Sequence, residues 1–244
     1  MRNIRLDICY EGTRYRGWQR LQNSDNTIQG KLEQALSRIL SEEIEVSASG
    51  RTDAGTHAQL QTVSFHCESN MPCEEILPTL RRYLPEDIGV YSCRNVSPRF
   101  HARLNAKEKT YCYRLWNSEE PCVFDRRFVY RDSRPVDLEK MQKAAELFLG
   151  QHDFSAFCAN TKMKKSTVRY ISDFRIEVIG DEIRFTVTGN GFLHHMVRIM
   201  VGTLLEVGRG EREIESITAL FGAPRAEAGE LVPAYGLCLM EVIY

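Results

Sequence analysis

The stretch SGRTDAGTHA, residues 49–58, is the part of the chain whose residue types most readily suggest chemistry. It holds one carboxylate, Asp53, between Arg51 and Gly55, with His57 close behind. An Asp beside glycines is typical of a turn. The flanking glycines would also let the backbone bend sharply or approach a ligand closely, and an Arg can bind a phosphate or stack on a base. The stretch therefore predicts either an ordinary turn or a loop that presents a reactive carboxylate.

Arg198 is a second unusual residue because it lies within GFLHHMVRIMVGTLLEVG, which is apolar on nearly every side. This pattern predicts a buried helix over residues 192–207. A guanidinium in such a helix is costly unless it is paired. Asp53 is a candidate partner, since an Arg beside a carboxylate lowers its pKa and keeps it ionised for nucleophilic attack. The alternatives are a purely structural salt bridge and a side chain that extends out of the helix end.

Tyr111 and Tyr113 lie two residues apart in KTYCYRLWN, which alternates as a strand does. Both therefore face the same side of the sheet. Either could stack against a flipped-out base, with Lys109 and Arg114 as basic neighbours. The alternative is a core Tyr whose hydroxyl is hydrogen-bonded at a rim.

Metal chemistry has little support in the sequence. None of the 8 cysteines forms a Cys-x-x-Cys pair, and several lie in apolar runs, which favours reduced thiols in a cytosolic protein. His194 and His195 are adjacent, so on a helix their side chains would diverge by about 100°. A metal-dependent hydrolase using Asp53, His57 and His66 is an alternative, but no second acid lies near Asp53.

Charge is sorted along the chain although the net charge is only −1. Residues 94–114 carry six basic side chains against the single acid Glu108, whereas residues 206–230 are rich in acids. Such sorting is consistent with solvated faces, or with a local basic surface that binds a polyanion. The candidate RNA contacts are Arg14, Arg16, Arg99, Arg103, Lys107, Lys109, Lys162, Lys164 and Lys165.

Hydrophobic periodicity predicts a similar order of elements in both halves of the chain. In the first half we expect strands at 4–10, 44–48, 62–67 and 88–93, and helices at 27–40 and 74–83. In the second half we expect strands at 109–116, 167–178, 182–188 and 237–243, and helices at 136–149, 192–207 and 212–221. The order indicates an α+β protein of two ferredoxin-like halves, 1–105 and 106–244, forming a mainly antiparallel sheet flanked by helices, with a central cleft. No apolar run is long enough for a membrane span and no signal peptide is evident, so we expect a cytoplasmic protein.

Several segments together resemble the TruA family of tRNA pseudouridine synthases. They are SGRTDAGTHA, RFHARLNAKEKTYCYRLWN, FLHHMVRIMVG and the terminal GLCLMEVIY, joined by the early YEGTRYRGWQ and TIQGKLE. The resemblance implies the pseudouridine synthase fold and isomerisation of uridine to pseudouridine in the anticodon stem-loop of tRNA, at positions 38–40. It also implies no cofactor, no metal, and a homodimer that holds tRNA.

The resemblance further implies roles for individual residues. Asp53 matches the catalytic aspartate, Arg198 its paired arginine, and Arg51 the arginine that helps displace the target base. Tyr111 matches the tyrosine stacked on that base, and Leu237 an apolar residue of the pocket. Attack at C1′, attack at C6 and a glycal intermediate all remain open.

This chain departs from the family pattern at two positions. Thr56 stands where a Val is common, and Cys112 lies between the two tyrosines where a basic or other residue is frequent. Neither change removes a catalytic group, but both are compatible with a paralogue of altered tRNA selection. A tRNA-binding protein or chaperone without catalysis is the remaining alternative, because it needs only the basic stretches.

Overall fold

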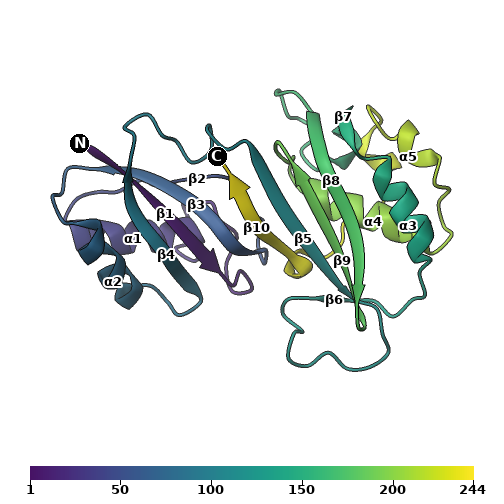
Figure 1. Ribbon diagram of the computed structural model, residues 1–244, viewed down its shortest axis with the longest axis horizontal. Coiled ribbons are helices and arrows are strands. Elements are labelled where there is room, and N and C mark those ends of the chain that lie inside the picture. The colour runs from purple at the N-terminus through teal and green to yellow at the C-terminus, as the bar shows by residue number, and fades with distance from the viewer. The chain divides into compact units, whose positions relative to one another are not determined.

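The computed structural model describes residues 1–244, which form two compact units (Figure 1). Unit 1 comprises Met1–Lys107 together with Leu239–Tyr244, and unit 2 comprises Glu108–Cys238. The last strand of the chain therefore lies mostly in unit 1, whereas sequence periodicity alone had assigned everything after residue 105 to the second half. The pairing of this strand with β3 (His57–Cys67) accounts for the assignment.

Unit 1 is built from four strands and two helices around β3. Its sheet has the order β4-β1-β3-β10, and a short β2 also pairs with β3. The element bounds are β1 Arg2–Tyr10, α1 Ile28–Leu40, β2 Ser47–Ala48, α2 Cys73–Tyr83, β4 Ile88–Val96 and β10 Leu237–Ile243. Figure 1 shows α1 and α2 next to this sheet. The order of β4, β1, β3 and β2 is that of a ferredoxin-like half, with β2 reduced to two residues.

The helices of unit 1 form where the sequence offers a cap and an apolar stripe. Thr27 caps α1, since its side chain accepts a hydrogen bond from the Gly30 N–H at 3.2 Å. The buried positions of this helix include Ile28, Leu32 and Leu36, which recur at helical spacing and pack inward. The predicted helix over 27–40 is thus confirmed to within one residue.

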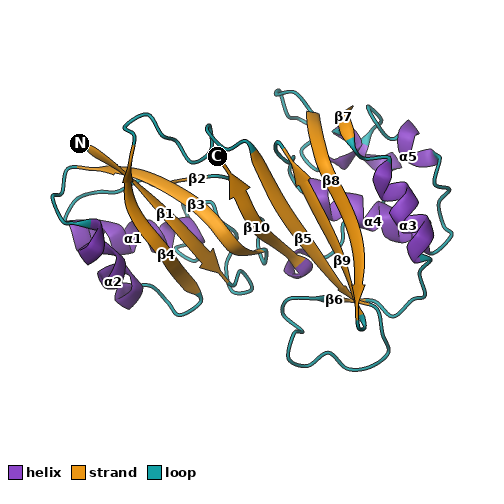
Figure 2. Ribbon diagram, viewed as in Figure 1, coloured by secondary structure: helices purple, strands orange, loops and turns teal.

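Unit 2 has a similar arrangement of strands and helices, and its β8 is the longest strand of the chain. Its sheet has the order β5-β9-β8-β7, with β6 paired to β5. The bounds are β5 Glu108–Trp116, β6 Tyr130–Arg131, α3 Leu138–Glu146, β7 Gly150–Asp153, β8 Val168–Ile179, β9 Glu182–Gly189, α4 Met196–Gly208 and α5 Ser216–Ala219. Three 3-10 turns lie at Ser155–Phe157, Arg225–Glu227 and Ala234–Gly236. Figure 2 shows the helices of this unit gathered beside β8 and β9.

Four predicted elements differ in the structure from what periodicity suggested, and one of them is the helix expected at 136–149, which is reduced to Leu138–Glu146. The strand expected at 44–48 is reduced to Ser47–Ala48, and the surface helix expected at 212–221 to Ser216–Ala219. The buried helix expected from residue 192 begins only at Met196. The cause is His195, whose φ of 65° lies in the left-handed region and prevents the helix from extending further back.

The fold class is nevertheless the predicted one, α+β with a mainly antiparallel sheet. The pairs β1–β3, β1–β4, β5–β9, β7–β8 and β8–β9 are all antiparallel, whereas the short β5–β6 pair is parallel. None of the helices has the length and apolar character needed to cross a bilayer.

Candidate active site

The loop that carries Asp53, residues 49–56, is anchored at its start to the strand that follows it. The Ser49 N–H donates to the Thr62 carbonyl at 2.9 Å, and the Ser49 hydroxyl hydrogen-bonds the Gln61 side chain. Gln61 Nε2 in turn donates to the Gly50 carbonyl at 3.0 Å. Both Ser49 and Gln61 are fully buried, so this end of the loop is rigid.

The loop is held again immediately before and after Asp53. The Thr52 hydroxyl lies 2.8 Å from the Tyr10 hydroxyl, and the Trp18 N–H donates to the Thr52 carbonyl at 3.0 Å. After the carboxylate, the Thr56 N–H donates to the Asp53 carbonyl at 3.1 Å, closing a turn that Gly55 completes at a φ of 82°. Asp53 itself is half-buried, so its position is fixed while its carboxylate keeps access to a ligand.

Arg51 extends from the same loop and is exposed. Its guanidinium therefore lies at the surface of unit 1, two residues from the half-buried Asp53. The loop thus places an accessible guanidinium, which can bind a phosphate, two residues from a fixed carboxylate.

Arg198 lies in the first turn of α4 in unit 2, not in the middle of a helix as its sequence context suggested. It is still buried, with 9% of its surface exposed. Its Nε donates to the Val232 carbonyl at 2.8 Å. The Val232 carbonyl therefore fixes the direction of this guanidinium, through a contact across 34 positions that no local pattern indicates.

The two tyrosines of β5 have different environments. Tyr113 is fully buried and its hydroxyl donates to the Pro233 carbonyl at 2.9 Å, and burial raises its pKa strongly. Tyr113 is therefore the core tyrosine of the two. Tyr111 is also largely buried, but its ring makes an edge contact with Phe192, with ring centroids 5.2 Å apart.

One segment of unit 2 organises these residues together. Val232 accepts from Arg198, Pro233 accepts from Tyr113, and a 3-10 turn then leads to Leu237 at the start of β10. Leu237 is buried, with 6% of its surface exposed. Within unit 2, the segment from Val232 to Leu237 therefore connects Arg198 with strand β5, which carries the two tyrosines, and ends at the buried Leu237.

A family model described as tRNA pseudouridine synthase matches residues 8–105 and 144–244. The chain belongs to the tRNA pseudouridine synthase family. It is 44% identical to tRNA pseudouridine synthase A 2 of Clostridium perfringens and 45% identical to tRNA pseudouridine synthase A of a Bacillus species, covering 100% of both chains in each case. It is also 40% identical to tRNA pseudouridine synthase A 2 of Bacillus cereus over 99% of both chains. The resemblance inferred from the sequence motifs is thereby confirmed.

Two histidines of this tRNA pseudouridine synthase family member are arranged differently from the sequence expectation. His194 and His195 precede α4, and their ring centroids lie 3.7 Å apart. The expected divergence assumed a helix, and the left-handed backbone at His195 removes that assumption.

The structure of unit 1 is not compatible with a metal site formed by Asp53, His57 and His66, which the metal-dependent hydrolase alternative requires. His57 and His66 lie nine residues apart on the same strand, β3, which separates them by roughly 30 Å at the rise of an extended chain. His57 is buried and its Nδ1 accepts from the Gly12 N–H at 2.9 Å, whereas the Nε2 of the exposed His66 lies 3.2 Å from the Pro98 carbonyl. These two rings cannot share one metal ion.

Most of the predicted RNA-contact residues of the family member are exposed. The exposed ones are Arg14, Arg16, Arg99, Arg103, Lys107, Lys162, Lys164 and Lys165, whereas Lys109 is half-buried. Arg14 is also engaged within unit 1, since its Nε donates to Asp87 at 3.0 Å. This ion pair raises the pKa of Arg14, and it makes Arg14 part of the scaffold as well as of the surface.

All eight cysteines of the family member are free thiols. Cys112 is buried, and its burial raises the pKa of the thiol. A buried thiol of raised pKa is a poor nucleophile, so Cys112 has a packing role on the face of β5 opposite the two tyrosines rather than a role in chemistry.

Apart from the metal alternative, sequence reasoning gave no role to His57, and it gave none to the glycines of YEGTRYRGWQ. Gly12 lies just after a predicted strand, and His57 lies just after the Asp53 loop, which was the only signal in the sequence. Their contact spans 45 positions, so no local pattern could reveal it.

Proposed function

We propose that this protein isomerises uridine to pseudouridine in the anticodon stem-loop of tRNA, at positions 38–40. Similarity along the whole chain to tRNA pseudouridine synthases carries the proposal. The Asp53 loop supplies the reactive group. Hydrogen bonds hold this loop in place, and the Asp53 side chain that it carries is half-buried.

The reaction breaks the C1′–N1 bond, turns the uracil and joins its C5 to C1′. No atom enters or leaves apart from protons, so the chain needs a nucleophile, a charged partner and walls that retain the detached base. We assign Asp53 as the nucleophile and Arg198 as the cation that keeps it ionised. Tyr111 is assigned to stack on the base and Leu237 to line the pocket. A burial of at least 90% at Arg198, Tyr111 and Leu237 supports these assignments, because a dry wall retains a detached base better than open water.

The target base must leave its stack before it can react, at a cost of a few kcal/mol. Exposed Arg51 is assigned to displace it, and phosphate contacts from the basic residues offset the cost. We further propose that the protein acts as a cytoplasmic homodimer with tRNA as its partner, as the family resemblance implies.

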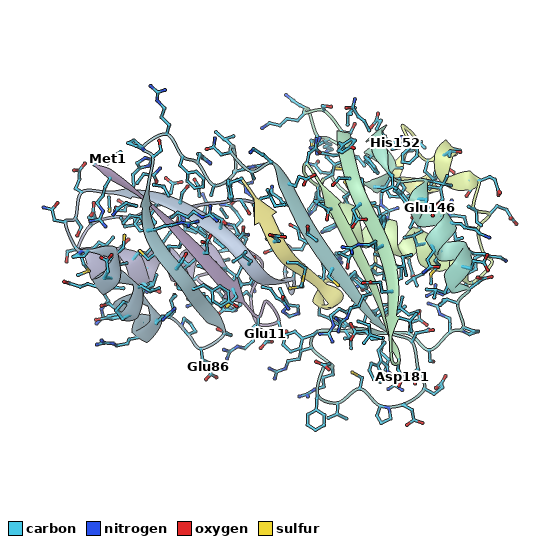
Figure 3. The ribbon with its side chains drawn as sticks, in the orientation of Figure 1. Met1, Glu11, Glu86, Glu146, His152 and Asp181 are labelled. Atoms are coloured by element: carbon cyan, nitrogen blue, oxygen red, sulfur yellow. The ribbon has the colours of Figure 1, made fainter.

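The test is pseudouridine formation by Asp53→Asn. A tRNA transcript carrying uridine tritiated at C5 releases tritium when C5 bonds to C1′, which gives a direct readout. We expect Asp53→Asn to abolish release while tRNA binding, measured by filter retention, stays within about threefold. Asp181→Asn is the matched control, because Asp181 lies at the exposed turn between β8 and β9 (Figure 3) and should leave release unchanged. Full activity in Asp53→Asn would refute the assignment.

The same experiment separates the alternative functions. If the unaltered protein binds tRNA and releases no tritium, it is a non-catalytic tRNA-binding protein. If tritium is released but mapping places pseudouridine outside positions 38–40, the protein is a paralogue with shifted site selection. Release that persists in EDTA removes the remaining argument for a metal.

A further inference from the structure

We propose that His57 is a positioning residue that fixes the backbone behind Asp53. This inference rests on the proposed function and extends it to a residue that does not touch the reacting base. His57 is the first residue of β3 and only 3% of its surface is exposed. Its Nδ1 accepts a hydrogen bond from the Gly12 N–H at 2.9 Å. Accepting at Nδ1 requires a lone pair there, so the ring is neutral with its proton on Nε2.

The partner of His57 belongs to a segment that lies directly against the Asp53 loop. We call residues 11–18 the backing loop. A Cβ placed on Gly12 would lie 2.0 Å from the Thr56 carbonyl oxygen, so the two backbones touch with no room for a side chain. Gly17 has a φ of 93°, and a Cβ there would lie 2.9 Å from the Thr52 oxygen and 3.1 Å from the Asp53 carbonyl carbon. The backing loop therefore supports both residues that bracket the carboxylate.

The far side of the backing loop is fixed to the segment that leads into β4. The Tyr15 hydroxyl donates to Asp87 at 2.5 Å, and the Glu11 N–H donates to the Asp87 carbonyl at 2.9 Å. Figure 3 shows Glu11 and Glu86 at the same end of unit 1. The backing loop is thus held between this segment and the Asp53 loop, and the His57–Gly12 bond fixes its first turn.

The functional consequence follows from the sensitivity of catalysis to geometry. A displacement of about 1 Å in a reacting group costs up to about 100-fold in rate. Without the acceptor at Nδ1, Gly12 loses its fixed position against Thr56, and the turn from Asp53 to Thr56 loses its support. The carboxylate would then spend less time in its reactive position, whereas tRNA contacts elsewhere on the surface would be unaffected.

The test compares three replacements of His57 with one control. In His57→Asn the side-chain oxygen stands where Nδ1 stood, so the bond to Gly12 can form. In His57→Gln the amide lies further out, at the place of Nε2, and in His57→Leu no acceptor remains. His66→Asn makes the same substitution at an exposed position of the same strand. Tritium release from tRNA labelled at uridine C5 gives kcat and KM, and thermal melts establish that each variant is folded at the assay temperature.

We expect kcat to fall by about 10- to 100-fold in His57→Leu and His57→Gln, with KM for tRNA within about twofold. His57→Asn should stay within about threefold of the unaltered protein, and His66→Asn should match it. Unchanged kcat in all three His57 variants would overturn the inference, and so would a loss confined to KM. An equal loss in all three, His57→Asn included, would overturn it in favour of a direct chemical role for the ring. Should the unaltered protein form no pseudouridine, the proposed function itself fails, which is a different result from normal activity in the variants.

Discussion

Thr56 is the residue of the Asp53 loop whose replacement has the most clearly defined expected effect. Its side chain is buried, with 2% of the residue's surface exposed, and its hydroxyl oxygen has no hydrogen-bond partner. A buried hydroxyl without a partner costs about 1–3 kcal/mol. Val has nearly the same shape and no polar atom, and it is also the residue that the family resemblance leads one to expect at this position.

We therefore predict that Thr56→Val raises the free energy of unfolding by about 1–2 kcal/mol. This is the lower part of the range, because a site shaped for Thr keeps some packing strain when it holds Val. For a chain of this size, such a gain corresponds to a rise in Tm of roughly 2–8 °C. Urea unfolding followed by far-UV circular dichroism, with the slope m unchanged, measures the gain directly.

Thr52→Val is the matched control, because it makes the same chemical change in the same loop. The Thr52 hydroxyl is paired with the Tyr10 hydroxyl at 2.8 Å, so its loss should lower stability by about 1 kcal/mol. Opposite signs at the two positions are the expected result. A loss of stability at both would refute the reasoning, since it would mean that the Thr56 hydroxyl is satisfied in solution.

Two further predictions concern unit 2. Burial alone would raise the pKa of Glu182, but hydrogen bonds and charge from Arg114 and Arg184 outweigh it and hold that pKa below the ordinary 4.5. A group whose pKa is lowered by folding stabilises the folded state fully above its unfolded pKa, and this contribution is lost as the pH falls through the folded pKa. Glu182→Gln should therefore lower the free energy of unfolding by on the order of 3 kcal/mol at pH 7, and by progressively less below pH 4.5, as measured in urea titrations. Gly202→Ala would place a Cβ 2.0 Å from the Glu230 carbonyl oxygen, so we expect a loss of about 1–3 kcal/mol in the same titrations; an unchanged midpoint would show that the segment moves freely.

Sequence patterns predicted the parts of the fold that local rules determine. Helix α1 follows from a capping Thr27 and apolar residues at helical spacing, and the β8–β9 hairpin from a Gly–Asp turn between alternating segments. The beginning of α4 could not be predicted in this way. The largely apolar stretch begins at Phe192, whereas the helix begins only at Met196, after a left-handed backbone at His195 that the apolar pattern does not reveal.

In the candidate site, too, local sequence suggested some features, whereas others depend on contacts between distant residues. Residue types in SGRTDAGTHA left open an ordinary turn or a loop that presents a reactive carboxylate, and the resemblance to a known family favoured the second. The supports of that carboxylate could not be predicted, because each is a contact between distant positions. Gly12 meets His57 across 45 residues, and Arg198 meets Val232 across 34. Such contacts depend on which strands pair, and periodicity alone does not specify that.

The two units use the same device to fix their predicted functional groups. In unit 1 a glycine with no room for a Cβ, Gly12, brings one backbone against another beside Asp53. In unit 2 Gly202 does the same for the segment that continues to Val232 and so fixes the Arg198 guanidinium. Backbone against backbone is the stiffest contact a chain can make, because no side-chain rotamer intervenes to absorb a displacement. A contact of this kind lies beside Asp53 in unit 1 and beside the segment that holds Arg198 in unit 2, so each group is supported within its own unit by backbone rather than by further charges.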